Sequence, residues 1–75
     1  PQKMENITYS GDKNPLDNPS VIKIISDSEK KISGVGRLLV RKSGTERLIR
    51  VMVEAEDISI IDDTISSIGS AIKEL

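Results

Sequence analysis

The chain has 75 residues, a net charge of -1, and neither cysteine nor histidine. This inventory excludes disulfide cross-links, His general bases, Cys nucleophiles and the zinc sites that need such ligands. A chain of this length makes one small domain, and because small domains bury a smaller share of their surface, we expect a thin stability margin. The longest apolar runs have three residues, far short of the roughly 18 that a membrane span needs. We therefore expect a soluble protein without a membrane partner.

The first elements along the chain are a strand and a loop. Residues 4–9 place Glu5, Ile7 and Tyr9 on one face, and this alternation with β-branched and aromatic residues predicts a strand. Residues 10–18 are rich in Gly, Asp, Asn and Pro, which is typical of a loop.

A helix is expected next. Asn18 followed by Pro19 is typical of a helix N-cap with proline at the first helical position, where its missing N–H is not needed. This helix has one apolar face. We expect the helix to end near Ser33, because the two glycines that follow stop it. That face is formed by Val21, Ile25, Ser28 or Glu29, and Ile32.

Two strands then flank a turn. Leu38 and Val40 point one way while residues 37, 39 and 41 point the other, and after the turn Ile49, Val51 and Val53 alternate with residues 50, 52 and 54. This pattern predicts a hairpin with one apolar face.

The last element is a helix with isoleucine or leucine at spacings of three and four, and Ser59 with Asp62 is expected to form a capping box at its start. A single sheet needs a cover, so we expect this stripe to pack on the apolar face of the hairpin. The order strand, helix, strand, strand, helix predicts an α+β fold, a small antiparallel sheet with two helices packed on one face. A fourth short strand near Glu56 would fit the same fold. The stripe consists of Ile58, Ile61, Ile65, Ile68, Ile72 and Leu75.

Positive charge gathers in residues 37–50, where five basic residues stand against Glu46 alone, a net charge of +4. Residues 51–75 carry a net charge of -5. A basic island on an acidic chain favours a local anion site, because a nucleic-acid surface normally has a broader positive footprint and aromatic stacking. Tyr9 is the only aromatic residue, so we expect no nucleic-acid partner.

The hairpin tip offers the groups that bind phosphate. If residues 44–47 form a four-residue loop, the antiparallel register places Arg41 opposite Arg50. Like charges that face each other destabilise a sheet, so we expect an anion between them. Two guanidinium groups, the hydroxyls of Ser43 and Thr45, and the backbone at Gly44 suit a phosphate. The alternative is that Glu46 or Glu54 neutralises one arginine and the turn is merely tight.

The segment RKSGTERLIRVMVEAED, residues 41–57, closely resembles the RxSGTEP-LIRVMVEGED signature of the last domain of phosphoglucosamine mutases, in the α-D-phosphohexomutase superfamily. The resemblance implies that Arg41, Ser43, Gly44, Thr45 and Arg50 grip the substrate phosphate. It also implies that the parent enzyme is an isomerase that interconverts glucosamine 6-phosphate and glucosamine 1-phosphate. A phosphoserine loop, a magnesium loop and a sugar-recognition loop would lie in earlier domains.

Because residue 1 is Pro and no signal segment follows, we expect residues 1–75 to be the C-terminal phosphate-binding domain of a longer chain. This fragment then holds no catalytic residue, metal or cofactor and is inactive alone. By the resemblance, its partners are a hexosamine phosphate and the other domains of a cytoplasmic enzyme of peptidoglycan precursor synthesis, with magnesium as cofactor. Arg47 replaces the family's usual proline, which would loosen the loop and add a third cation near the anion. The alternatives are a phosphohexomutase for glucose or mannose phosphates, and a free-standing regulatory or RNA-binding α+β module.

Overall fold

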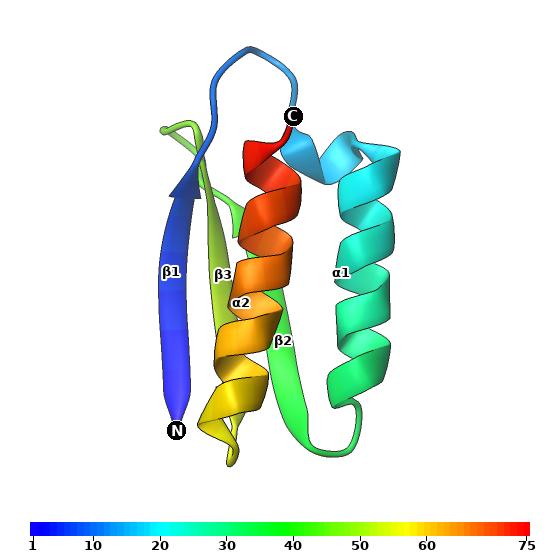
Figure 1. Cartoon of the computed structure of the whole chain (residues 1–75). Coiled ribbons are helices and arrows are strands. Elements are labelled where there is room, and N and C mark those ends of the chain that lie inside the picture. Colours follow the sequence, from blue (N-terminus) through cyan, green and yellow to red (C-terminus); the bar gives the residue numbers. More distant parts are fainter.

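Three antiparallel strands form one sheet in the order β1-β3-β2, and two helices pack on one face of it (Figure 1). The computed structural model describes residues 1–75. The strands are β1 (Gln2–Thr8), β2 (Gly36–Lys42) and β3 (Leu48–Ala55), and the helices are α1 (Pro19–Ile32) and α2 (Ile58–Lys73). This arrangement confirms the α+β class and the expected order. Two details differ: the loop before α1 contains a short 3-10 helix, η1 (Pro15–Asp17), and no fourth strand forms, because the chain passes from β3 almost directly into α2.

The helix starts confirm one expected cap and correct the other. The side chain of Asn18 accepts hydrogen bonds from the backbone N–H groups of Ser20 and Val21 at 2.9 and 3.4 Å, so α1 begins where the Asn-Pro pair indicates. The expected capping box of Ser59 and Asp62 does not form. Asp57 is the N-cap of α2 instead, and its carboxylate accepts from both N–H and Oγ of Ser59. Ser59 therefore lies inside the helix, where it cannot cap it.

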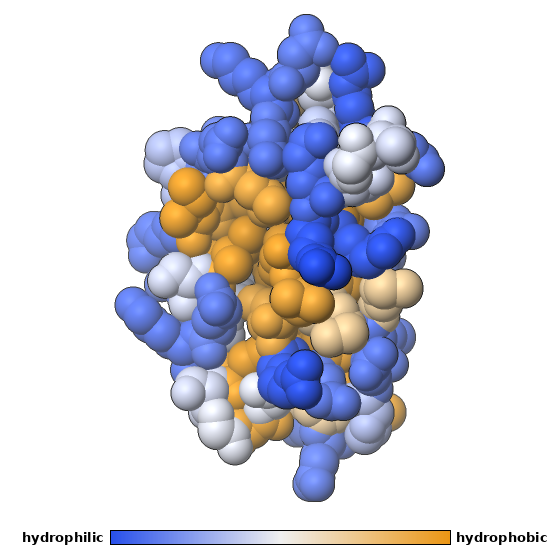
Figure 2. Space-filling model, turned by 180° about the vertical axis from the view of Figure 1, so that it is seen from behind, coloured by the Kyte–Doolittle hydropathy of each residue, from blue (hydrophilic) through white to orange (hydrophobic).

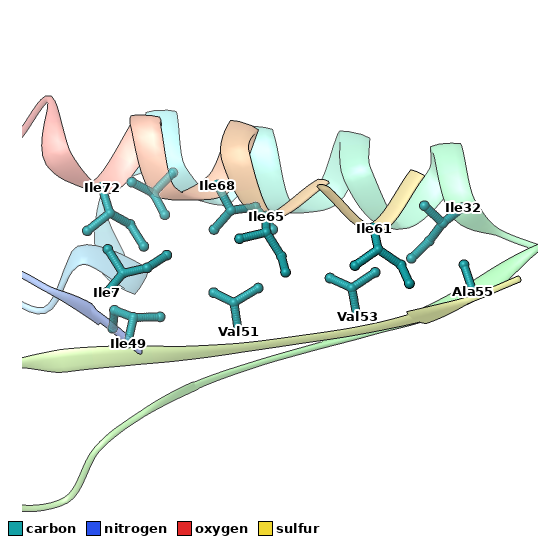
Figure 3. Packing of buried hydrophobic residues seen from close by; sticks show 11 residues of the cluster. Ile7, Ile32, Ile49, Val51, Val53, Ala55, Ile61, Ile65, Ile68 and Ile72 are labelled. Atoms are coloured by element: carbon teal, nitrogen blue, oxygen red, sulfur yellow. The ribbon is translucent and has the colours of Figure 1, made fainter. Parts of the chain in front are cut away.

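The core lies between the sheet and the two helices, and the side chains of the two layers point toward one another (Figure 3). Ile49, Val51 and Val53 of β3 are fully buried, as the alternating pattern predicts. The two ends of the α2 stripe, Ile58 and Leu75, are exposed, contrary to expectation, because Ile58 is the first residue of the helix and Leu75 lies beyond its last residue. The buried part of the stripe consists of Ile61, Ile65, Ile68 and Ile72. On α1, Ser28 rather than Glu29 faces the core.

The hairpin of β2 and β3 has the expected register. Val40 pairs with Val51 and Arg37 with Glu54, and the backbone N–H of Ser43 donates to Leu48 O at 3.0 Å. At the other end of β2 the strands approach closely at Gly36, where an added Cβ would lie 2.5 Å from the backbone oxygen of Glu54. Neither helix is both long enough and apolar enough to cross a membrane.

Candidate functional site

The predicted anion-binding arginines lie on the open face of the sheet, opposite the helices. In the register, Asn6 of β1 pairs with Arg50 of β3, and Arg50 pairs with Arg41 of β2, so the three residues form one row across the whole sheet. The neighbours of Arg50 along β3, Ile49 and Val51, face the helices. Because successive side chains of a strand point to opposite faces, Arg50 points away from the helices. We call these three residues the arginine row.

A small apolar stripe lies beside the arginine row on the same face. Met4 pairs with Met52, which pairs with Leu39, and Met4 and Leu39 are largely exposed. Figure 2 shows this face of the molecule, with apolar side chains in its middle and polar ones around them. The arginine row therefore borders an uncovered apolar surface and is itself open to solvent.

The two facing arginines have no acidic partner within the chain. Its four ion pairs join other residues, and neither Arg41 nor Arg50 takes part in any of them. The carboxylate of Glu54 lies 3.9 Å from Arg37, and Glu46 forms no ion pair. The alternative in which a glutamate neutralises Arg41 or Arg50 thus does not occur here. Two guanidinium groups without a carboxylate partner on neighbouring strands concentrate positive charge at this point of the open face.

The tip itself is a turn held by Ser43. Its Oγ accepts hydrogen bonds from the backbone N–H groups of Thr45 and Glu46 at 3.4 and 3.3 Å. A serine hydroxyl that accepts in this way keeps its own O–H as a donor. Gly44 has neither a positive φ nor any atom within 4 Å of an added Cβ. The fold does not require glycine at position 44, whereas close approach of an anion to the backbone does favour it.

Arg47 contacts the loop that follows β1, a contact that the sequence did not predict. Its Nη2 lies 2.8 Å from Oδ1 of Asp12, and its backbone oxygen accepts from the N–H of Tyr9 at 3.1 Å. The side chains of Arg47 and Asp12 are 62% and 94% exposed, so this ion pair adds little stability. It nevertheless joins the tip to the loop after β1, and it occupies the arginine that we expected as a third cation. No local pattern signals a pair so far apart in sequence.

Four of the five predicted residues are exposed, and Ser43 is half-buried. Two hollows of the molecule lie elsewhere, one of about 1200 Å³ between the loop after β1 and the C-terminal end of α2 and one of about 300 Å³ between β1 and α2, and none of the five residues lines either. The arrangement can bind and orient an anion, but it offers no pair of groups for acid–base chemistry. No three Asp or Glu side chains come together, so the residues here do not fit the several oxygen ligands of a magnesium site.

An α+β fold with a basic, glycine-containing hairpin tip matches a known class of domain. Residues 4–68 match the family model described as "Phosphoglucomutase/phosphomannomutase, C-terminal domain". The chain belongs to this family, as the resemblance of residues 41–57 indicates.

Within this family the chain is similar to curated phosphoglucosamine mutases. It is 46% identical over 74 residues to that of Cereibacter sphaeroides, 45% over 74 residues to that of Vibrio cholerae, and 47% over 73 residues to that of Actinobacillus pleuropneumoniae. These alignments cover 97 to 99% of this chain but only 16 to 17% of the relatives. The chain thus spans about one sixth of the length of the curated relatives it matches.

Proposed function

We propose that this chain binds the phosphate group of a hexosamine phosphate, as the C-terminal domain of an enzyme that interconverts glucosamine 6-phosphate and glucosamine 1-phosphate. The binding groups are Arg41, Ser43, Gly44, Thr45 and Arg50. The observation that carries the proposal is the facing pair Arg41 and Arg50, two exposed guanidinium groups without a carboxylate partner. Membership of the family and the similarity to phosphoglucosamine mutases support the choice of ligand.

A phosphate between the two arginines removes the repulsion that the register creates. The side chain of Arg41 makes no hydrogen bond within the chain and that of Arg50 uses only its Nε, so most of their guanidinium donors can turn to phosphate oxygens. Guanidinium groups present planar, permanently charged donors that match such oxygens in pairs. The hydroxyls of Ser43 and Thr45 and the backbone near Gly44 add neutral donors.

The role of these residues is to position the substrate. The domain holds the phosphate that does not react, and a fixed phosphate orients the sugar for chemistry performed by groups outside these 75 residues. Because the site is open on the isolated chain, each charged contact is weak, and we expect dissociation constants on the order of 1 mM. Glucosamine 6-phosphate and inorganic phosphate should therefore bind with similar affinity.

An NMR titration with a matched pair of variants tests the proposal. In the parent chain, glucosamine 6-phosphate and inorganic phosphate should each shift the amide resonances of residues 41–45 and Arg50. Arg41→Gln and Arg37→Gln remove the same charge from the same face of β2, but only Arg41 faces Arg50. We expect Arg41→Gln to abolish most of the binding and Arg37→Gln to preserve it. Equal losses of phosphate affinity in the two variants would mean that only net charge matters. Amide shifts centred on α2 would refute the proposed site.

A further inference from the structure

We infer that Asn6 is a positioning residue of the phosphate site: it holds the guanidinium of Arg50 in the orientation that receives the anion. The inference rests on the proposed function. Arg50 Nε donates a hydrogen bond to Asn6 Oδ1 at 3.4 Å, across the strand pair β1 and β3. This is the one hydrogen bond of the Arg50 side chain within the chain, and Asn6 makes no other through its side chain.

The contact determines which donors of Arg50 remain free. A guanidinium has five N–H groups and no acceptor, so it can meet Asn6 only through the amide oxygen. With Nε–H bound to Oδ1, the two terminal amino groups are left, and they form a fork for two phosphate oxygens. An exposed arginine without such a contact samples many rotamers and loses more entropy when it binds an anion. Asn6 therefore prepares Arg50 for binding.

The amide is also the right chemical type for this place. An aspartate at position 6 would hold Arg50 at least as firmly, but its negative charge would neutralise the guanidinium and repel the phosphate. A neutral acceptor orients the arginine and leaves both positive charges of the row uncompensated. The Nδ2 amino group of Asn6 remains available as a further donor at the end of the row.

Three variants of the 75-residue chain test the inference, with inorganic phosphate as the probe. Asn6→Ala should weaken phosphate binding about 2- to 10-fold, as expected for the loss of one hydrogen bond, and Asn6→Asp should weaken it further. Gln2→Ala is the matched control, because Gln2 lies on the same strand and face but opposite Glu54, and it should bind as the parent does. Titrations would follow the Nε–Hε resonances of Arg50 and Arg41, and urea unfolding would measure stability.

A positioning role has a spectroscopic signature that a merely structural role lacks. Without phosphate, Asn6→Ala should shift the Nε–Hε resonance of Arg50 and leave that of Arg41 in place. Parental affinity of Asn6→Ala, or binding by Asn6→Asp as tight as that of the parent, would overturn the inference while the proposed function stands. If phosphate does not shift residues 41–45 and Arg50 even in the parent chain, the proposed function fails and the inference fails with it.

Discussion

The two faces of the sheet perform different tasks with residues that alternate along one strand. On the face toward α2, Ile49, Val51 and Val53 of β3 are fully buried. On the open face, Arg50 stands between the first two of them, exposed and opposite Arg41. Because the pleat sends neighbouring side chains to opposite faces, stability and anion binding are separated within a single strand. Substitutions on the two faces should therefore change one property and leave the other.

The largest effect is expected on the covered face. Ile68→Ala should lower the free energy of unfolding by about 2 to 5 kcal/mol, because it removes a fully buried side chain and leaves a cavity. The matched control is Ile58→Ala in the same helix, where the side chain is exposed and the change should be within about 0.5 kcal/mol. Urea denaturation measures both, and phosphate affinity of the folded molecules should be unchanged. Similar losses for the two variants would contradict the packing described.

The two glycines of the hairpin sharpen the comparison. Gly36→Ala should destabilise the chain by about 1 to 3 kcal/mol, because the new Cβ would collide with the backbone of β3. Gly44→Ala should leave stability unchanged or raise it by up to about 1 kcal/mol, yet weaken phosphate binding by crowding the backbone at the tip. Thermal melts and phosphate titrations of both variants test this. A Gly44→Ala chain that binds phosphate normally would remove Gly44 from the site.

Arg50→Ala tests the open face by stability. Relief of repulsion from Arg41 should leave the anion-free chain as stable as the parent or more stable, by up to about 1 kcal/mol. The parent should gain about 1.4 kcal/mol from sulfate at ten times its dissociation constant, and the variant should lose most of that gain. Melts with and without sulfate at matched ionic strength separate binding from screening. Arg37→Ala should retain the response, and a destabilised Arg50→Ala chain that still responds would show that Arg50 is structural.

The smallest effect concerns the start of the helix that covers the sheet. Hydrogen bonds from Ser59 stabilise the charged carboxylate of Asp57 and lower its pKa below the ordinary value. A lowered folded pKa contributes stability that is present above about pH 4 and is lost as the pH falls through the folded pKa. Asp57→Asn should flatten this part of the stability profile between about pH 5 and pH 2. Asp63→Asn in the same helix is the control, and an equal flattening by both would contradict the assignment.

Local sequence patterns predicted most elements of the fold and the facing pair of arginines on the hairpin. The Asn18-Pro19 pair marked the start of α1, because a cap and a fixed φ act on the next residues alone. Local patterns were less reliable at the start of α2. Asp57 and Ser59 are both residue types that cap helices well, and in the structure the earlier one, Asp57, is the N-cap. Apolar spacing identified the middle of the α2 stripe but could not show that Ile58 and Leu75 lie at its uncovered ends.

By itself, the sequence determined the hairpin register and hence the facing pair Arg41 and Arg50, because alternation and loop length are local properties. Only the tertiary structure placed β1 against the other edge of β3, and that pairing brought Asn6 to Arg50 and the following loop, with Asp12, to Arg47. These contacts join residues 35 and 44 positions apart. Periodicity tells which face a side chain takes, but which strands become neighbours depends on how all elements pack together over the core.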